Sequence, residues 1–230
     1  AYKAVIWIRH DLPINGLDLY IYYGKKNVES KSNYTAVFTE TVAEAGVVYT
    51  DENALYVSYK FLNETGEVPA VFASITSYLD TDEASARVID VNTTGFKVYT
   101  EESADNDGDH ANEYISWIAF RKGAWVVCGK LIQVGNESVT DSYTMFTVNY
   151  DTPNFVWLSQ LQTNNGGSPA HTRMDNPSTN SISIKIEPSD NVDSYPTSEE
   201  VVYLVAPVMS CSEGDFTINT GKEYFNQPRS

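Results

Sequence analysis

Residues 114–120 read Tyr114-Ile115-Ser116-Trp117-Ile118-Ala119-Phe120, an alternating pattern that is typical of a β-strand. Short runs of β-branched and aromatic residues recur elsewhere, for example at 56–61 and 96–99. Turn-forming residues such as Asn106-Asp107-Gly108 separate these runs, and this spacing is typical of an all-β sandwich or barrel. The sequence therefore predicts an all-β fold, in which a short acidic stretch around Thr39 to Ala45 is the only plausible helix.

The chain also repeats itself. A shift of 86 residues places Arg87 on Arg173 and Glu113 on Glu199 without gaps. Self-similarity at a fixed spacing indicates that one structural unit occurs more than once. We therefore expect tandem antiparallel β-sandwich modules.

The repeat divides the chain into four parts. Two complete copies are predicted at residues 41–124 and 125–209, and the two chain ends resemble the halves of a third copy. Residues 1–40 resemble its second half, and residues 210–230 resemble its opening strand. We expect this C-terminal strand to complete the partial module by strand pairing, within its own chain or in a neighbouring subunit. The predicted assembly strand contains Phe216, Ile218, Tyr224 and Phe225.

Composition excludes several classes of partner. The chain has 31 acidic and 15 basic residues and a formal charge of −16. Nucleic-acid binding needs clustered cations that neutralise phosphates, so neither nucleic acid nor an anionic membrane surface is an expected partner. The apolar runs are also too short to insert across a bilayer.

Features of exported proteins are present. The chain begins at Ala1 and reads like a mature product from which a signal peptide has been removed, which predicts a secreted or cell-surface protein. Cys128 and Cys211 suit either one bridge between neighbouring modules or two buried thiols. Candidate glycosylation sites are Asn33, Asn63, Asn92 and Asn136.

Metal and catalytic chemistry have little sequence support. Asp105, Asp107 and Asp109 alternate in one loop and could converge on Ca²⁺, whereas the alternative is a solvated acidic turn between two strands. The sequence contains no nucleophile elbow, phosphate loop or dinucleotide fingerprint. We therefore expect a protein that is not an enzyme and needs no cofactor, with Ca²⁺ as the one candidate ion.

Four segments of the first complete copy form a recognisable series. They are Val71-Phe72-Ala73-Ser74-Ile75-Thr76, Ala86-Arg87-Val88, Thr94-Gly95-Phe96-Lys97 and Ile115-Ser116-Trp117-Ile118. In their order and spacing they resemble the H-type lectin domain of snail agglutinins and discoidin C-terminal domains. The resemblance implies a six-stranded antiparallel β-sandwich that forms trimers and binds N-acetylgalactosamine-type sugars between protomers.

The same resemblance suggests binding residues. Arg87 and Arg173 occupy the place of the family's sugar-contacting arginine, and Asp51 lies near its sugar-binding aspartate. The alternative role for Arg87 is an inter-strand ion pair with Glu102 or Glu113. The candidate carbohydrate-binding set is Arg87, Arg173, Asp51, Glu102, His110 and Glu113.

One departure from the family affects the expected ligand. Family members that bind galactosamine carry a Trp-His pair where this chain has Tyr99-Thr100-Glu101-Glu102 and, in the second copy, Lys185-Ile186-Glu187-Pro188. The usual sugar specificity is therefore not expected. Two functions remain open: a lectin-like protein that binds glycans at inter-module sites and self-associates as a polymer or pseudo-trimeric ring, or a structural subunit of an extracellular filament, sheath or matrix.

Overall fold

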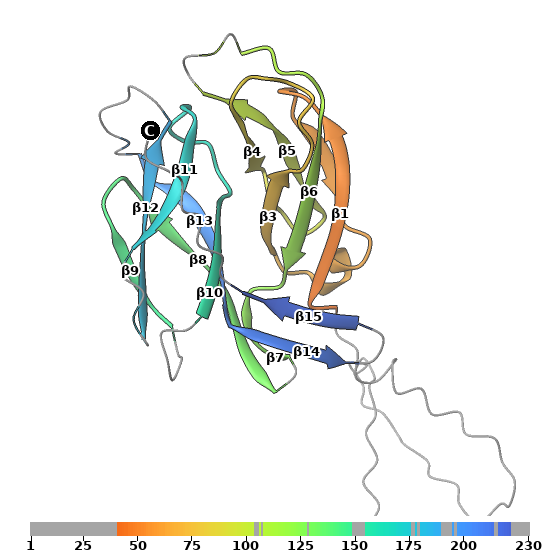
Figure 1. The fold of residues 1–230 in the computed structure, drawn as a ribbon, viewed down its shortest axis with the longest axis vertical. Helices are drawn as coiled ribbons and strands as arrows, with labels where there is room; N and C mark the ends of the chain where they lie inside the picture. The colour runs from red at the N-terminus through yellow and green to blue at the C-terminus, as the bar shows by residue number, and fades with distance from the viewer. Residues whose placement is uncertain are drawn as a thin grey trace, which may run out of the picture. The chain divides into compact units, whose positions relative to one another are not determined.

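The computed structural model divides the chain into two units, residues 1–41 and 42–230. Its regular structure is almost entirely antiparallel β-strand in the part of the chain that it describes (Figure 1), which confirms the predicted all-β fold. The described helix, η1 (Leu62–Thr65), is a 3-10 turn, and no described helix is long and apolar enough to cross a membrane. The described residues are 41–103, 106, 108–127, 129–148, 155–175, 178, 180–189, 195, 197–213 and 216–221.

Strands β1 to β6 form a sandwich of two three-stranded sheets, here called the first sandwich. One sheet has the order β1-β6-β3 and the other the order β2-β5-β4. Each described pairing in these sheets is antiparallel. The strands are β1 (Ala43–Thr50), β2 (Leu55–Ser58), β3 (Ala70–Ile75), β4 (Ala84–Ile89), β5 (Gly95–Glu102) and β6 (Glu113–Phe120).

Strands β7 to β13 form the second sandwich. Its sheets have the orders β10-β13-β8-β7 and β11-β12-β9, so β7 adds an edge strand that the first sandwich does not show among its described residues. The strands are β7 (Gly123–Val127), β8 (Lys130–Val139), β9 (Thr144–Thr147), β10 (Phe155–Leu161), β11 (Ala170–Asp175), β12 (Ser181–Pro188) and β13 (Glu199–Pro207).

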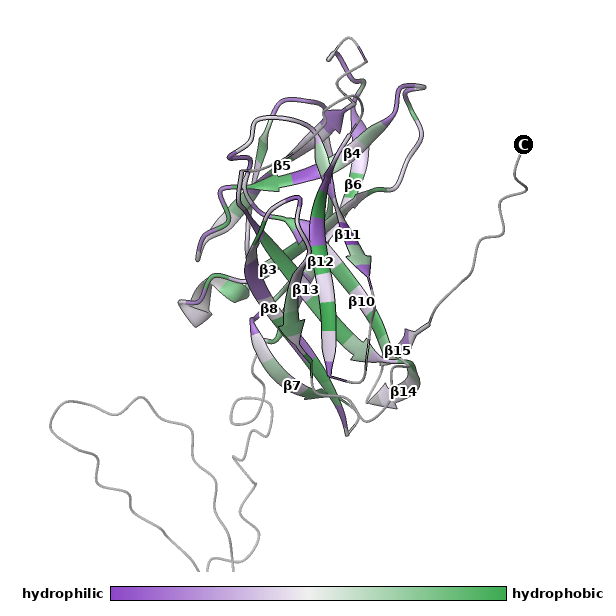
Figure 2. Cartoon of the chain, turned by 90° about the vertical axis from the view of Figure 1, so that its left-hand side faces the viewer, coloured by the Kyte–Doolittle hydropathy of each residue, from purple (hydrophilic) through white to green (hydrophobic). Residues whose placement is uncertain are grey.

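Each sandwich encloses its own apolar core, because alternate side chains of a strand point to the same face. In β12, Ile182, Ile184 and Ile186 are buried while the residues between them are partly exposed. Figure 2 shows the resulting apolar and polar bands along this strand. The first core is built in the same way around Val88, Phe96, Val98 and Ile115.

The internal repeat is visible in the strand positions. A shift of 86 residues carries the bounds of β4 onto those of β11 and the bounds of β5 onto those of β12. The hairpin of β14 (Met209–Glu213) and β15 (Phe216–Thr220) repeats that of β7 and β8 by the same shift. Even its register is preserved: Met209 pairs with Thr220 as Gly123 pairs with Val134.

The described part of the predicted assembly strand pairs within its own chain, where β15 lies antiparallel to β14. The expected pairing with residues 1–40 stays a prediction. Phe216 and Ile218 lie in this ladder, whereas Tyr224, Phe225 and the N-terminal half-module at 1–40 lie outside the described residues.

The predicted helix around Thr39 to Ala45 is wrong for its described residues. Ala43 to Ala45 belong to β1, which pairs with β6 along its whole length. The acidic residue in this stretch has a tertiary partner instead: the Glu44 carboxylate accepts hydrogen bonds from the backbone N–H groups of Lys60 and Phe61, at 2.8 and 2.9 Å. These groups begin η1, so Glu44 acts as its cap from another element.

The two sandwiches share a further apolar cluster. It joins the outer face of the sheet β1-β6-β3 to the outer face of the sheet that contains β8 and β13. Buried Phe72 and Ala70 come from the first sandwich, and buried Val134, Val202 and Leu204 come from the second. Residues 42–230 therefore form one unit, and its described residues build three apolar clusters, one of them between the sandwiches.

Candidate functional site at the inter-sandwich boundary

Arg87 lies at the boundary between the sandwiches. It is in β4, and its side chain is 1% exposed because the β10–β11 segment of the second sandwich covers it. Nη1 donates to Glu101 Oε2 at 3.1 Å, and Nη2 donates to the carbonyl oxygen of Thr163 at 2.7 Å. Further acceptors are Asn164 Oδ1 at 3.2 Å and the Ala170 carbonyl at 3.4 Å. One guanidinium thus binds acceptors from both sandwiches.

Two expectations about Arg87 are corrected by this arrangement. The guanidinium is enclosed by protein and is not accessible to a sugar. The expected ion pair forms, but its partner is Glu101 rather than Glu102 or Glu113. Burial raises the pKa of Glu101, and the nearby Arg87 partly opposes that rise. Arg87 and Glu101 both belong to the first sandwich, and the bonds of Arg87 to Thr163, Asn164 and Ala170 join this buried pair to the second sandwich.

Amide side chains reinforce the same boundary. Gln162 mimics a neighbouring strand, since its Nε2 donates to the Val71 carbonyl at 2.7 Å and its Oε1 accepts from the Val71 N–H at 3.4 Å. Gln160 Nε2 donates to the Ala86 carbonyl at 3.0 Å. These bonds satisfy backbone groups of β3 and β4 where the second sandwich covers them.

Arg173 occupies the equivalent position in the second sandwich but a different environment. Its side chain is 58% exposed and bonds to Glu187, the equivalent of Glu101. His171 Nε2 lies 3.1 Å from the same Glu187 carboxylate. The hydrogen bond from Arg173 lowers the pKa of Glu187. The repeat therefore preserves the arginine–glutamate pair, but only the first pair is covered.

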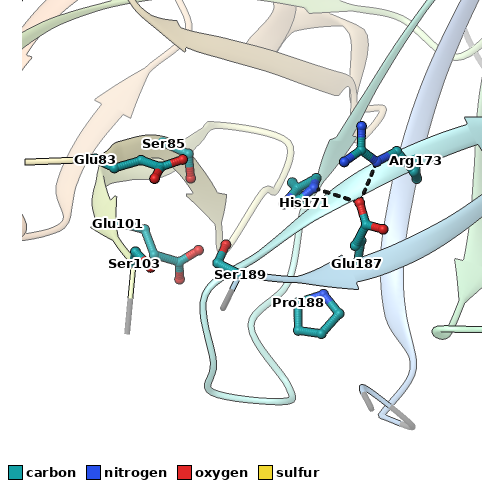
Figure 3. Close-up of a pocket in the computed structure, with 10 residues that line it drawn as sticks. Glu83, Ser85, Glu101, Ser103, His171, Arg173, Glu187, Pro188 and Ser189 are labelled. Atoms are coloured by element: carbon teal, nitrogen blue, oxygen red, sulfur yellow. Dashed lines mark hydrogen bonds and ion pairs between the residues drawn. The ribbon is translucent and has the colours of Figure 1, made fainter. Parts of the chain in front are cut away.

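Arg173 lines an open cleft of about 510 Å³ between the sandwiches. In Figure 3, Glu83, Ser85 and Ser103 face it from the first sandwich, and Arg173, His171 and Glu187 lie on the opposite wall. Hydroxyl, carboxylate, imidazole and guanidinium groups can all hydrogen-bond a polar ligand. Arg173 belongs to the candidate carbohydrate-binding set. In this cleft it lies beside both sandwiches and remains exposed.

Glu102, His110 and Glu113 come together in a buried cluster of the first sandwich. His110 Nδ1 lies 2.9 Å from Glu102 Oε1 and 3.9 Å from Asp80 Oδ2, and its Nε2 lies 3.8 Å from Glu113 Oε1. All but Asp80 are buried. The structure thus places three of the candidate carbohydrate-binding residues where they support a loop and have little exposed surface.

Glu113 has a loop-binding role that the sequence reasoning missed. Its carboxylate accepts from Ser77 Oγ and from the N–H groups of Leu79 and Asp80, at 2.7 and 3.1 Å. Burial disfavours its charge, but these hydrogen bonds outweigh that effect and lower its pKa.

Glu199 binds the corresponding loop of the second sandwich. It accepts from Thr163 Oγ1 and from the N–H groups of Asn165 and Gly166, at 3.0 and 2.8 Å. Tyr195 also donates to it at 2.7 Å. The alignment of Glu113 with Glu199 was the available signal, because both glutamates begin equivalent strands and hold equivalent β3–β4 and β10–β11 loops.

Asp51 is a turn residue. Its Oδ1 accepts from the backbone N–H and side-chain amide of Asn53, at 2.8 and 3.0 Å, and these bonds lower its pKa. Its backbone carbonyl accepts from the Thr100 N–H at 2.9 Å. Asp51 therefore shapes the β1–β2 connection, and the structure does not join it to Arg87.

The remaining predicted sites are only partly described. Asp105 and Asp107 lie outside the described residues, whereas Asp109 is exposed, and no described group of side chains is arranged to hold a metal ion. Cys128 is also outside, and Cys211 lies in β14 opposite Ile218. Of the sequons, Asn33 is outside, Asn63 lies in η1, and Asn92 and Asn136 are exposed.

No family model matches the chain, and no solved structure matches it significantly. A curated relative, Halomucin from Haloquadratum walsbyi, is 25% identical over 183 residues. The match covers 77% of this chain and 2% of Halomucin, so the chain spans a very small part of that relative's length.

Proposed function

We propose that this chain is a non-enzymatic structural segment of an extracellular surface protein, in which consecutive sandwiches are joined as one rigid unit. The observation that carries the proposal is the buried Arg87, which bonds acceptors of both sandwiches. A flexible pair of binding modules does not need a buried charge at its boundary. A load-bearing or spacing element benefits from one, because the contact then has a single geometry.

The energetics of the boundary support rigidity. Removing one partner of a buried ion pair leaves an uncompensated charge, which destabilises a protein by about 3–5 kcal/mol. The apolar cluster between the sandwiches adds buried area from Phe72, Val134 and Leu204. Relative motion of the sandwiches would expose both the buried ion pair and the apolar cluster to water.

The comparison supports the extracellular part of the proposal. The similarity to Halomucin is weak, but it extends over 77% of the chain and therefore includes more than one module. The small share of Halomucin that is matched suits a segment of a longer protein. A formal charge of −16 favours solubility in an exposed setting.

The test is whether the sandwiches behave as one body. The double variant Arg87→Met/Glu101→Gln removes the charges while keeping side chains of similar size. We expect small-angle scattering to show a broader distribution of sizes than for the native chain, and calorimetry to show two unfolding transitions in place of one. The matched control is Arg173→Met/Glu187→Gln, which removes the equivalent but exposed pair.

Two results would contradict the proposal. The first is a native chain that already unfolds in two independent transitions. The second is an Arg87 variant whose scattering and unfolding match those of the Arg173 control.

Glycan binding in the inter-sandwich cleft is a second candidate function. It is favoured by the polar cleft of about 510 Å³ in which Arg173, His171 and Ser85 face one another across the boundary. This site keeps the lectin-like hypothesis while replacing Arg87, which is enclosed, with the exposed Arg173 as its centre.

A glycan array with and without Ca²⁺ tests this candidate. We expect Arg173→Ala to abolish any binding and Lys97→Ala, an exposed cation of the first sandwich, to leave it unchanged. Binding that survives Arg173→Ala, or an array without any bound glycan, would exclude the cleft as a lectin site.

A further inference from the structure

The outer face of the sheet β1-β6-β3 is covered along only part of its length. Phe72 and Ile118 point outward from this sheet into the apolar cluster between the sandwiches. Further along the same face, Val47, Tyr49 and Tyr114 are 60, 52 and 51% exposed. They share the outward face because alternate residues of a strand point to the same side. We call Val47, Tyr49 and Tyr114 the tyrosine platform.

The two tyrosines of the platform form one aromatic surface. Tyr49 and Tyr114 lie directly opposite each other in the ladder of β1 and β6. Their ring centroids are 4.8 Å apart, and the ring planes are inclined at 43°. Val47 is the next outward residue of β1 and extends the surface along the strand. Because each ring is about half exposed, one ligand can contact both rings.

Hydroxyl groups border the platform on the side of β3. Thr76 Oγ1 donates to the carbonyl oxygen of Tyr114 at 3.0 Å and lies 3.2 Å from Ser116 Oγ. Ser74 is opposite Ser116 in the ladder of β3 and β6. Ser74 and Ser116 also line a hollow of about 330 Å³, whose other lining residues come from both sandwiches. The platform therefore continues past a row of hydroxyls into a pocket.

This face of the sheet carries no charged side chain within the three described strands. The outward residues are Ala43, Ala45, Val47, Tyr49, Tyr114, Ser116, Ile118, Phe120, Ala70, Phe72 and Ser74. The chain as a whole has a formal charge of −16. A charged ligand would find no ion-pair partner on this face, and an anionic one would be repelled by the protein. The chemistry of the face suits a neutral ligand with apolar and hydroxyl groups.

The second sandwich builds the same sheet without the platform. The 86-residue shift aligns Tyr114 with Glu200, and the residue opposite Glu200 is Ser138. Asn136 stands opposite Val202 as Val47 stands opposite Ser116. Folding of the module thus does not require an apolar residue at any of the three positions. Exposed apolar groups that the fold does not need are typical of a binding surface.

We propose that the tyrosine platform binds a neutral glycan. One pyranose ring places its C–H face on Tyr49 and Tyr114, because the negative face of an aromatic ring attracts the partly positive C–H groups. Its hydroxyls exchange hydrogen bonds with Ser116 and Thr76, since each of these hydroxyls can both donate and accept. The next sugar of the chain enters the hollow beside Ser74.

The size of the platform favours a glycan over a protein partner. A fully buried tyrosine contributes about 150–250 Å² of surface, so a half-exposed one offers about 100 Å². The three platform side chains together offer about 300 Å², whereas a stable protein interface buries about 800 Å² on each partner. A mono- or disaccharide matches the smaller area.

This site is distinct from the cleft at Arg173. The hollow beside the platform and that cleft share no lining residue. The proposal also does not depend on the rigid joining of the sandwiches, because every platform residue belongs to the first sandwich. The two sites can therefore be tested separately in the same chain.

The test begins with an array of neutral and anionic oligosaccharides, followed by calorimetric titration of the full chain with the strongest binder. We expect a neutral oligosaccharide, and we expect Tyr49→Ala/Tyr114→Ala to weaken its binding about tenfold or more. Tyr49→Phe/Tyr114→Phe keeps both rings and should retain most of the affinity. The matched control is Tyr56→Ala, which removes a tyrosine that is 47% exposed on the other sheet of the first sandwich.

Several results would overturn the proposal. They are an array without a bound neutral glycan, binding that Tyr49→Ala/Tyr114→Ala leaves intact, and an equal loss in the Tyr56→Ala control. Binding that is lost in Arg173→Ala but kept in the platform variant would assign the glycan to the cleft instead. Native chains that associate with each other, and lose this association in the platform variant, would identify the platform as a protein interface. Thermal unfolding of each variant shows whether it is folded, and the phenylalanine variant provides the comparison if the alanine variant is not.

Discussion

Arg87 and Arg173 occupy equivalent positions on β4 and β11 and pair with equivalent glutamates, yet the first side chain is 1% exposed and the second 58%. The arginine–glutamate pair is thus preserved by the repeat. Whether the pair is buried depends on which part of the protein packs against it. The same arginine–glutamate motif holds two sandwiches together at one place and lines an open cleft at the other.

Replacing the two arginines should have very different effects on stability. Arg87→Ala leaves Glu101 buried without its partner, so we expect the free energy of unfolding to fall by about 3–5 kcal/mol. Arg173→Ala removes an exposed pair that contributes about 0–1 kcal/mol. Urea unfolding followed by tryptophan fluorescence measures both. Equal losses for the two variants would show that burial does not govern the strength of this pair.

The glutamates that hold the loops should be more important than their surface neighbours. Glu113→Ala removes the acceptor for the N–H groups of Leu79 and Asp80, and a buried donor without a partner costs about 1–3 kcal/mol. We expect a loss of at least that size by chemical unfolding. Glu83→Ala, an exposed change of the same kind, should stay within about 0.5 kcal/mol of the native chain. A Glu113→Ala variant as stable as Glu83→Ala would remove this role.

The strands and their repeat could be predicted because they depend on local pattern. Alternation over residues 114–120 predicts β6, and the shift of 86 residues that aligns Arg87 with Arg173 also aligns β4 with β11. Glu44 is an example in which the local pattern leads to a wrong prediction. An acidic, alanine-containing stretch resembles a helix, but Glu44 accepts hydrogen bonds from the start of η1, some 16 residues later, and no local pattern encodes that partner.

The site was harder to predict than the fold for the same reason. Position in the repeat identified Arg87, Glu113 and their equivalents, but which carboxylate Arg87 contacts depends on side-chain direction along β5. Glu101 and Glu102 are neighbours in sequence and point to different faces. Glu101 bonds to Arg87, and Glu102 bonds to His110. The burial of Arg87 depends on how the two sandwiches pack against each other. This packing cannot be predicted from the sequence of either module alone.

Acid should destabilise the protein through its loop-holding glutamates. Hydrogen bonds lower the pKa of Glu113 and Glu199 below their ordinary value, so the unfolded chain takes up protons at a higher pH than the folded one. Stability is therefore present above the ordinary glutamate pKa of about 4.3 and is lost as the pH falls through the lowered values. The raised pKa of Glu101 acts in the opposite direction. Urea midpoints should therefore stay level between pH 6 and about pH 5 and fall from there to pH 3.

The double variant Glu113→Gln/Glu199→Gln is the control for this pH dependence. It removes both titrating groups, so its urea midpoint should start lower at pH 6 and then change less with acid. An unchanged slope would mean that other carboxylates cause the acid sensitivity.

Gly95 should not tolerate a side chain. A Cβ at this position would lie 2.3 Å from the carbonyl oxygen of Val57, which is backbone of the paired strand β2 and cannot move aside without shifting the ladder. We expect Gly95→Ala to cost about 1–3 kcal/mol, as for overpacking in a core. Gly221→Ala, where nothing lies within 4 Å, is the control and should be neutral. Thermal unfolding of the two variants side by side decides the matter.

Salt should stabilise the chain. The formal charge of −16 produces repulsion among carboxylates that is strongest in the compact folded state, and added salt screens exposed charges over distances that shrink from about 30 Å at 0.01 M to about 3 Å at 1 M. The buried Arg87–Glu101 pair is screened much less than the exposed Arg173–Glu187 pair, so little attraction is lost in exchange. The urea midpoint should therefore rise between 0.01 and 1 M NaCl. The variant Asp82→Asn/Glu83→Gln, which neutralises two exposed carboxylates, should be more stable than the native chain at low salt and gain less from added NaCl. A midpoint that falls with NaCl would mean that attractive surface pairs outweigh the net repulsion.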